Sequence, residues 1–430
     1  MNWDLISHLT WRANNMANVS SSNGLENRPK LRFPGFDEPW NEVELSHVLC
    51  ERNEYAEKDG AYDHVTLSKD GIYAKTARYD RDFLVSTENK KYKVTHYSDL
   101  CYNPANLKFG VICLNTYGDA IFSPIYITFE INKNYDANFI GANLTRYNFI
   151  NYALRFQQGT VYERMAVSPE DFLSIKCFFP NEREQKKISS FVGLLDKRIA
   201  KQQQLIDTLK KYKRGLSNVL FDGLLEDSNS HLCTFGNVMT ILQNNTFSRD
   251  DLSSGCDEIR NIHYGDVLIK YGALVDFRNA IIPSIKADRD ISKFSESSYL
   301  QNGDVVFADT AEDYTVGKAT EIIGAENVAA LSGLHTIPCR PQKKFAPMYL
   351  GYYFNSDYFK RQLYPMIQGT KVSSISKSEM VKSKIIIPNM QLQNRIASIL
   401  KALDDRIDAA KLTSTRIMEF RKGLLQQLFI

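Results

Sequence analysis

The sequence has few cysteines and histidines, and neither residue type stands at the spacing of a metal site. The 430 residues hold seven cysteines and seven histidines. The histidines form no H-E-x-x-H motif and no His/Cys ligand pattern. The cysteines are odd in number, scattered and never spaced C-x-x-C, which is typical of reduced thiols in a cytosol. A structural zinc site, a disulfide scaffold and metal-dependent hydrolysis have no support, and we expect a cytoplasmic location.

Long apolar runs are also missing. No stretch approaches the roughly 18 consecutive apolar residues of a membrane span. The first residues carry Asp4 and lack a basic start that leads into an apolar run, so they do not resemble a secretory signal. We therefore expect no membrane association.

The net charge is small, but the charged residues are unevenly distributed along the chain. The net charge is +3, and 43% of the residues are hydrophobic. Lys+Arg minus Asp+Glu gives 17 − 20 = −3 for residues 29–180 and again for residues 222–388. The two stretches 181–221 and 389–430 give 10 − 4 = +6 and 7 − 4 = +3. Basic charge is thus concentrated in two short segments, which could be solvated helix faces or contact surfaces.

An internal repeat organises the chain. Residues 176–221 align without gaps with residues 384–429, at an offset of 384 − 176 = 208 throughout. The offset relates identical residues, among them Pro180 and Pro388, Gln185 and Gln393, Asp196 and Asp404, Gly215 and Gly423, and Phe221 and Phe429. A Gln-Gly-Thr element at 158 and another at 368 each lie about twenty residues before the repeated proline. The chain therefore consists of two halves built on one plan.

Each copy predicts a short strand that ends at proline and is followed by a long helix. Asn181 and Glu184 resemble a capping box at the helix start. Apolar residues then recur at alternating steps of four and three, which is a coiled-coil pattern. At about 1.5 Å per residue each helix would reach about 60 Å, and its nearest expected partner is the other copy. The predicted seam contains Ile188, Val192, Leu195, Ile199, Ile206, Leu209, Leu216 and Leu220 in the first helix, and Ile396, Leu400, Leu403, Ile407, Ile417, Leu424 and Leu428 in the second.

The remaining segments predict two mixed α/β modules. Residues 125–131 alternate apolar and polar side chains, as in a half-buried strand, and the segments GDVLIKYG at 265 and GDVVFADT at 303 resemble turns that enter strands. We place an N-terminal extension at 1–28, the first module at 29–180, the first helix at 181–221, the second module at 222–388 and the second helix at 389–430. The expected fold class is α+β.

These elements together resemble the specificity subunit of type I restriction-modification systems. The resemblance covers about residues 29 to 430, and its most specific parts are QGT at 158, PNEREQKKI at 180, LLDKRI at 194, KRGLSNVLF at 213 and their second-half counterparts. The second copy departs from the usual E-x-E-Q helix opening and has Met390-Gln391-Leu392-Gln393, which puts contacts at that helix start in doubt.

The resemblance implies a non-catalytic DNA-recognition subunit with an antiparallel helix pair. Each module would read one half of a bipartite site on double-stranded DNA, and the helices would set the spacing and dock two modification subunits. Restriction subunits would add ATP-driven cleavage. We expect no cofactor on this chain, because S-adenosylmethionine, ATP and Mg²⁺ would belong to the partner subunits. Since the modules share little sequence, the two half-sites should differ.

Two rival functions remain open at this stage. A coiled-coil scaffold without DNA preference would carry the same helices. A self-contained DNA methyltransferase or nuclease would need its own motifs, but Asn103-Pro104-Ala105-Asn106 lacks the second proline and the aromatic residue of the N-P-P-Y/F loop. Gly317-Lys318 completes no phosphate loop, because Glu312 stands in place of the first glycine. Glu88-Asn89-Lys90 and Glu184-Gln185-Lys186 resemble only the end of a metal-nuclease signature.

Candidate DNA contacts are cations, amides and hydroxyls that could reach phosphates or base edges. Because each module is net negative, such a face must be a local cluster, and solvated roles remain open for every cation. The glycines of the two QGT elements could equally serve turns. The candidates are Arg78, Lys90, Lys91, Lys93, Arg146, Arg155, Gln158 and Thr160 in the first module, and Lys270, Arg278, Asn279, Lys371, Ser373 and Lys377 in the second.

Overall fold

The computed structural model describes residues 27–57, 60–75, 91–159, 165–254, 258–313, 315–369 and 372–430, together with the backbone of 17–18. The chain divides into two compact units, one of residues 1–202 and 413–430 and the other of residues 203–412. We call them unit 1 and unit 2. No helix in the described ranges is both long and apolar enough to cross a membrane.

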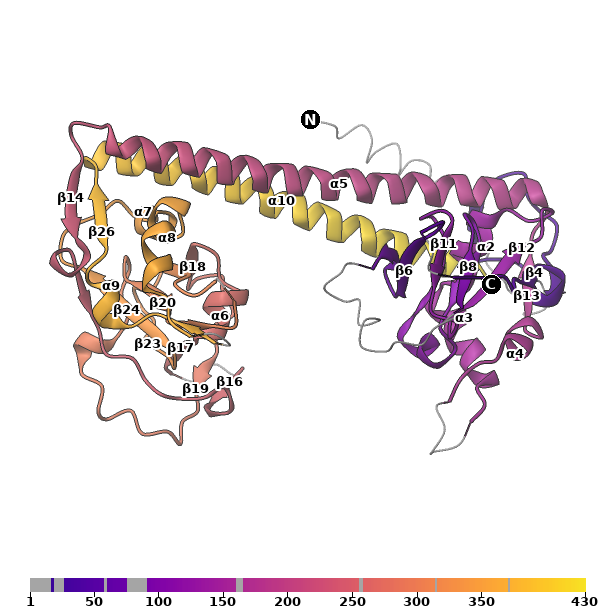
Figure 1. The fold of residues 1–430 in the computed structure, drawn as a ribbon, viewed down its shortest axis with the longest axis horizontal. Coiled ribbons are helices and arrows are strands. Elements are labelled where there is room, and N and C mark those ends of the chain that lie inside the picture. Colours follow the sequence, from indigo (N-terminus) through magenta and orange to yellow (C-terminus); the bar gives the residue numbers. More distant parts are fainter. Residues whose placement is uncertain are drawn as a thin grey trace. The chain divides into compact units, whose positions relative to one another are not determined.

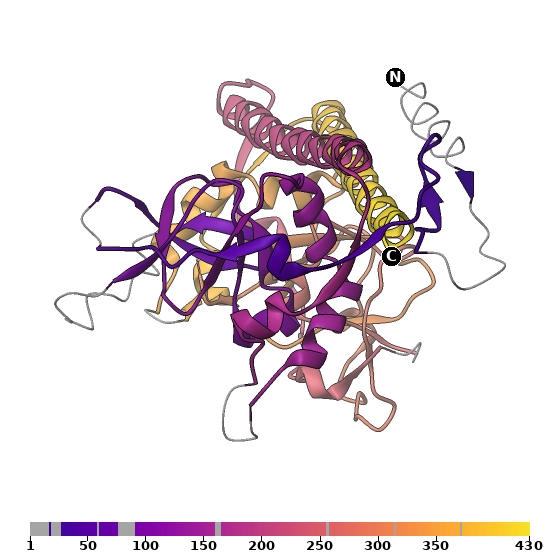
Figure 2. The same ribbon diagram turned by 90° about the vertical axis from the view of Figure 1, so that its right-hand side faces the viewer.

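Two long helices account for the repeated segments (Figures 1 and 2). Helix α5 spans Glu182–Asp222, and helix α10 spans Met390–Leu428. Both follow the repeated proline, as the sequence predicts. Each helix begins in one unit and ends in the other.

Within each unit the two helix segments run antiparallel. In unit 2 the last turns of α5, including Phe221, share a core with Ile396 and Leu400 near the start of α10. In unit 1 the first turns of α5, including Ile188, share a core with Leu428 at the end of α10. The predicted antiparallel coiled coil and internal repeat are thereby confirmed.

Unit 1 is built from two sheets. The first has the order β10-β9-β12-β4 with antiparallel neighbours. The second has the order β5-β8-β11-β6-β7, in which β11 and β6 are parallel. The strands are β4 (Leu49–Glu51), β5 (Tyr55–Ala56), β6 (Asp63–Ser68), β7 (Gly71–Ala74), β8 (Tyr92–Thr95), β9 (Leu100–Tyr102), β10 (Ile112–Leu114), β11 (Ala120–Phe122) and β12 (Ile127–Ile131).

Short helices and two outer strand pairs complete unit 1. Strand β13, which ends at Phe179 just before the repeated proline, pairs with β3, and β2 pairs with the backbone of β1. These elements are β1 (Ala17–Asn18), β2 (Leu31–Arg32), β3 (Asn41–Glu44), α2 (Ala137–Leu144), α3 (Tyr147–Ala153), α4 (Pro169–Leu173) and β13 (Lys176–Phe179).

Unit 2 repeats the strand order of the first sheet of unit 1, while its second sheet differs in strand number and order. Its strands β22-β20-β24-β15 follow the same antiparallel order as β10-β9-β12-β4, and β18 extends the sheet parallel to β22. A second sheet, β16-β19-β17-β23, contains the parallel pair β17 and β23. The strands are β15 (Met239–Ile241), β16 (Leu252–Ser253), β17 (Arg260–Ile262), β18 (Leu274–Asp276), β19 (Ser284–Ile285), β20 (Val305–Ala308), β22 (Ala319–Ile323), β23 (Ala330–Ser332) and β24 (Thr336–Pro341).

Short helices and outer strands also complete unit 2, and some of them have counterparts in unit 1. Strand β26, which ends at Ile387 before the repeated proline, pairs with β14 as β13 pairs with β3. The elements are β14 (His231–Thr234), α6 (Tyr264–Ile269), β21 (Thr310–Ala311), α7 (Tyr349–Phe354), α8 (Asp357–Leu363), β25 (Ser373–Ser374), α9 (Lys377–Met380) and β26 (Lys384–Ile387).

One predicted strand is wrong. The segment GDVLIKYG forms helix α6 and not a turn into a strand, whereas GDVVFADT does enter strand β20. The His263 side chain caps α6 by accepting from Gly265 N, and Val267 is fully buried. Such a short apolar run fits either helix or strand, so packing decides its conformation.

The last phenylalanine of each repeat anchors the end of its helix in a core. Phe221 packs against Tyr349 and Tyr353 in unit 2, with ring centroids 6.1 and 5.6 Å away. Phe429 packs against Trp40 and Phe139 in unit 1, at 6.3 and 5.2 Å. Each unit therefore contains the start of one long helix and the end of the other.

Candidate nucleic-acid interface and helix-pair surface

The two long helices are joined by the same ion pair in each unit. In unit 2 Lys213 Nζ lies 2.5 Å from Asp404 Oδ1, and in unit 1 Arg421 Nε lies 2.5 Å from Asp196 Oδ1. The offset of 208 converts one pair into the other, since 213 + 208 = 421 and 404 − 208 = 196. In unit 2 the Tyr352 hydroxyl also donates to Asp404 Oδ2 at 2.9 Å. Burial and the Asp404 carboxylate raise the pKa of that phenol.

The predicted seam faces the interior of each unit. Leu195 and Leu403 are 2% and 7% exposed, whereas the neighbouring Leu194 is 50% exposed. Ile188, Val192, Leu195, Ile206, Ile396, Leu400, Leu403, Ile407, Leu424 and Leu428 are buried, and Ile199, Leu209, Leu216, Leu220 and Ile417 are half-buried.

Both helix starts are held by an equivalent buried glutamine. Gln185 Oε1 accepts from Asp136 N at 3.0 Å, and Gln185 Nε2 donates to the Pro180 carbonyl at 2.9 Å. In the second copy Gln393 Oε1 accepts from Ala346 N at 2.9 Å, and its Nε2 donates to the Pro388 carbonyl at 2.8 Å. The altered opening of the second helix therefore keeps this contact.

The residue before that glutamine differs between the copies. Glu184 is fully buried and accepts from Arg32 Nε at 2.8 Å, Arg32 Nη2 at 2.7 Å and Trp40 Nε1 at 3.3 Å. Its counterpart Leu392 packs against the apolar core of unit 2. The capping residue Asn181 accepts from Glu184 N at 3.0 Å, while the Glu184 carboxylate turns to Arg32. Only the first half of the expected capping box is therefore formed.

Two of the candidate DNA contacts in unit 1 do not lie free on the surface. Lys93 is 1% exposed, and its ammonium donates to Glu51 Oε1 at 3.1 Å and Asn53 Oδ1 at 2.8 Å. Arg146 donates to Asn143 and to the Ile430 carbonyl, and its guanidinium lies 4.6 Å from the Phe429 ring centroid. Burial lowers the pKa of Arg146 to about 10. Both side chains hold the unit together, and we no longer assign them to a DNA face.

The other described candidates of unit 1 are exposed. They are Lys91, Arg155 and Gln158, while Arg78, Lys90 and Thr160 lie outside the described residues. Arg155 lies 5.6 Å from the Tyr152 ring centroid, and Gln158 Nε2 donates to Asp171 Oδ1 at 3.0 Å. Gln158 also forms a β-bridge with Ala166.

In unit 2 the described candidates are exposed or half-buried, and most have an intramolecular partner. Lys270 pairs with Asp266 at 2.9 Å, and Arg278 makes two hydrogen bonds of 2.8 Å to Asp276, which also accepts from Asn279. Ser373 lies in β25 and is half-buried, and Lys371 lies outside the described residues.

Lys377 belongs to a polar cluster that the sequence did not reveal. Lys377 Nζ donates to Asn244 Oδ1 at 2.9 Å, and Asn244 Nδ2 donates to the Gly333 carbonyl at 3.4 Å. His335 follows two residues after Gly333, and its Nδ1 lies 3.4 Å from Asp309 Oδ1. These residues come from four distant segments, so no local motif marks them.

Glycine serves the backbone of both Gln-Gly-Thr elements. Gly159 and Gly369 have φ of +135° and +101°, which favours glycine. A Cβ on Gly369 would lie 2.0 Å from the Val372 carbonyl oxygen. Gln368 bridges to Ser374 as Gln158 bridges to Ala166. The turn interpretation therefore accounts for these glycines without a DNA contact.

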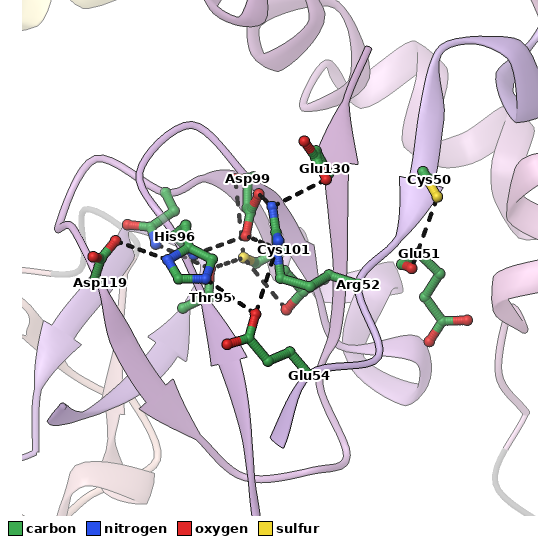
Figure 3. A network of polar contacts seen from close by, with 12 residues as sticks. Cys50, Glu51, Arg52, Glu54, Thr95, His96, Asp99, Cys101, Asp119 and Glu130 are labelled. Carbon is green, nitrogen blue, oxygen red and sulfur yellow. Dashed lines mark hydrogen bonds and ion pairs between the residues drawn. The ribbon is translucent and has the colours of Figure 1, made fainter. Parts of the chain in front are cut away.

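A second polar network, in unit 1, was also missed by the sequence analysis (Figure 3). Arg52, just after β4, donates to both carboxylate oxygens of Asp99, at 2.9 and 3.1 Å. His96, just after β8, places Nδ1 2.9 Å from Asp119 Oδ1 and Nε2 3.2 Å from Glu54 Oε2. Burial lowers the pKa of His96, but the hydrogen bonds to Asp119 and Glu54 outweigh it, and the pKa is raised overall.

Each unit has an aspartate in an equivalent turn, and the arginine that pairs with this aspartate comes from a different strand region in each unit. Asp99 accepts from His96 N at 2.8 Å, and Asp304 accepts from Gln301 N at 2.8 Å. In unit 2 the arginine that pairs with Asp304 is Arg340 of β24, at 2.7 Å. The aspartate is thus common to the units, while the charges around it differ.

Most of the motifs weighed for a resident enzyme have structural roles, as does the buried Glu321, while Glu88-Asn89-Lys90 lies outside the described residues. The Asn103 side chain caps a turn by accepting from Ala105 N and Asn106 N. Lys318 Nζ donates to the Leu268 carbonyl at 2.7 Å. Glu321, whose pKa burial raises to about 7, accepts from Met348 N and Gly351 N and so holds the start of α7. Among the residues that the structure describes, no group of three His, Cys, Asp or Glu could hold a metal ion.

Comparisons with known proteins agree with this architecture. Residues 239–417 match the family model of the type I restriction modification DNA specificity domain. The type I restriction enzyme MjaVIII specificity subunit of Methanocaldococcus jannaschii is 23% identical over 281 residues, which cover 61% of this chain and 63% of that protein. The match thus spans less than two thirds of this relative.

Two solved structures share the fold. The S subunit of a type I restriction-modification system from M. genitalium has a TM-score of 0.51 at 15% identity and covers 94% of this chain and 99% of its own. A chain from a study of complex assembly and conformational transition of the type I R-M system has a TM-score of 0.54 at 16% identity and covers 91% and 97%.

Proposed function

From this relationship to the type I restriction-modification specificity subunits we propose that the chain selects the DNA sequence on which such a system acts. Unit 1 reads one half of a bipartite double-stranded site, and unit 2 reads the other half. The half-sites differ in sequence, so the target is asymmetric. The chain itself performs no chemistry and works in the cytoplasm.

The observation that carries the proposal is the contrast between what the repeat keeps and what it changes. The offset of 208 preserves the helix ion pair, the buried glutamine and the terminal phenylalanine. One sheet of each unit has the same strand order, but the side chains at equivalent places differ, such as the arginine that pairs with Asp99 or Asp304. Equivalent helices with different modules fit one partner bound twice and two different DNA half-sites.

The proposed DNA face is made of the exposed candidates, the half-buried Ser373 and the candidates outside the described residues. Cations there would contact phosphates, and amides would reach base edges. Lys93 and Arg146 are left out because they are engaged inside unit 1. The set is Arg78, Lys90, Lys91, Arg155, Gln158 and Thr160 in the first half, and Lys270, Arg278, Asn279, Lys371, Ser373 and Lys377 in the second.

The proposed partners carry the chemistry. Two modification subunits dock on the helix pair and methylate adenine with S-adenosylmethionine. Restriction subunits join them for cleavage that uses ATP and Mg²⁺. Readers held on one face of DNA by a spacer of fixed length would sit about one helical turn, about 34 Å, apart or at a multiple of that distance.

The test maps methylated adenines by single-molecule sequencing in cells that express the modification subunits with and without this chain. We expect a two-part motif with a fixed gap that appears only with the chain. If the partners are expressed and assembled and no chain-dependent motif appears, the scaffold alternative replaces this proposal. Methyl transfer or cutting by the purified chain alone would instead support the resident-enzyme alternative.

A module exchange separates the two halves. Replacing residues 29–175 by the corresponding module of another specificity subunit should change one half of the motif and leave the other half and the gap unchanged. An unchanged motif would show that unit 1 does not read DNA.

A further inference from the structure

Two glycines in the long helices have no structural reason within this chain. Gly215 of α5 and Gly423 of α10 occupy the same repeat position, since 215 + 208 = 423. Neither glycine has a positive φ, and an added Cβ would meet nothing within 4 Å at either position. Glycine inside a helix lowers its stability relative to alanine. At both positions glycine lowers helix stability, and no neighbouring atom within the chain requires the absence of a Cβ. Its presence in both copies therefore indicates a contact outside the chain.

An exposed aromatic side chain precedes each of these glycines by one helical turn. Tyr212 is 60% exposed on α5, and its counterpart Phe420 is 38% exposed on α10. On α5 the same face continues with Leu205 and Val219, which are 46% and 71% exposed and lie seven residues to either side of Tyr212. Each unit thus presents an aromatic ring beside a bare stretch of helix backbone.

We propose that each aromatic-glycine pair, Tyr212 with Gly215 and Phe420 with Gly423, is the contact point for one α-helix of a modification subunit. The inference rests on the proposed function, because that function supplies a partner bound in two copies. Glycine lets the backbone of a second helix approach closely, and the ring fills the groove beside it. Because the offset of 208 relates the two pairs, one kind of partner helix fits both.

The charge around the pairs indicates the chemistry of the partner helix. Helix α5 carries ten Lys+Arg against five Asp+Glu, and α10 carries seven against four. Lys201, three turns before Tyr212, and Arg416, one turn before Phe420, are exposed and form no ion pair with any part of the chain that the structure describes. The partner helix therefore carries carboxylates beside its apolar strip.

Leucine substitutions test the contact while leaving the fold in place. Gly215→Leu and Gly423→Leu place a bulky side chain on the proposed contact, where the chain itself leaves open space. Gly193→Leu is the matched control, because Gly193 also lies in α5 with open space around an added Cβ but has Lys401 as its counterpart. The measurements are the number of modification subunits bound per full-length chain, the Kd of each site and the melting temperature.

We expect titration to show two sites of wild-type affinity per wild-type chain, one such site in each single variant and none in the double variant. Each substitution should raise the Kd of its own site by about tenfold or more. The double variant should melt no lower than the wild type, because leucine favours helix more than glycine does. The control should keep both sites.

A double variant that still binds two modification subunits with unchanged Kd overturns the inference and leaves the proposed function standing. A wild-type chain that binds no modification subunit overturns both. Tyr212→Ser and Phe420→Ser provide an independent check, since each should weaken only its own site.

Discussion

Lys213 and Asp404 form the ion pair in unit 2 that Arg421 and Asp196 form in unit 1. The Lys213–Asp404 pair is partly buried, with the side chains 24% and 31% exposed, and the Tyr352 hydroxyl supplies a third partner. A cation at this position interrupts the apolar seam in both copies. Because an unpaired charge there would lie partly buried between helices, the ion pair fixes which turns of α5 and α10 lie opposite each other.

Reversing one charge should therefore destabilise the helix pair. Asp404→Lys places an ammonium beside Lys213 and removes the acceptor of the Tyr352 hydroxyl, so we expect the free energy of unfolding of unit 2 to fall by roughly 1–3 kcal/mol. Chemical denaturation followed by helix circular dichroism measures the change.

The exchanged double variant, Lys213→Asp with Asp404→Lys, should regain part of that loss. The control is Lys401→Asp, because the Lys401–Asp405 pair joins neighbouring turns on the surface of α10. Strictly additive losses in the double variant would contradict a specific pairing.

The seam gives a second prediction with a neighbouring control. Leu195→Asp and Leu403→Asp each bury a carboxylate among apolar side chains, so each should lower stability by about 3–5 kcal/mol. Leu194→Asp, at a position that is 50% exposed, should change stability by less than about 0.5 kcal/mol. Equal effects at positions 194 and 195 would show that the seam is drawn on the wrong face.

The helix pair could be predicted because the buried face of a long regular helix appears in the sequence as a periodic pattern of apolar residues. A period of 3.5 residues, continued from Ile188 to Leu220 and repeated at a constant offset, marks the buried face without knowledge of the partner. The constant offset also predicts that the two helices pair with each other, but it does not predict which charged side chains join them.

The modules were harder to predict because their contacts join residues far apart in the chain. Arg52 and Asp99 are 47 positions apart, and Lys377 and Asn244 are 133 apart, so no local pattern records either pair. Lys93 alternates with apolar residues in β8 and was interpreted as a surface cation. Only the fold shows that hydrogen bonds to Glu51 and Asn53 on the neighbouring segment offset the cost of burying the Lys93 ammonium.

The His96 network predicts a pH dependence of unit 1. The pKa of His96 is raised in the folded chain, so the folded protein binds this proton more tightly than the unfolded chain does. In the unfolded chain the pKa of histidine is about 6.5. The stabilisation is fully present below about pH 6.5 and is lost as the pH rises through the folded pKa.

His96→Gln should therefore be less stable than the wild type at pH 5.5, and the difference in melting temperature should shrink toward pH 9. Replacing the exposed His231 by glutamine controls for the general effect of pH on the protein. A difference that grows with pH would mean that His96 is held in its neutral form.

The buried pair of Arg32 and Glu184 provides the last prediction, because the second copy shows what an apolar substitute looks like. At the position equivalent to Glu184 the second helix has Leu392, packed against the core of unit 2. The Glu184 and Arg32 side chains are 0% and 4% exposed. Arg32→Met leaves the Glu184 carboxylate buried without its main partner, so we expect a loss of roughly 3–5 kcal/mol.

Arg32→Met combined with Glu184→Leu should recover most of that loss, because two apolar side chains of similar volume replace both charges at once. Only the weaker hydrogen bond from Trp40 then loses its acceptor. The three variants and the wild type form a double-mutant cycle in which denaturation measures the coupling energy. A double variant no more stable than Arg32→Met alone would show that the segment around Arg32 needs the ion pair itself, and that the first helix start cannot adopt the apolar solution of the second.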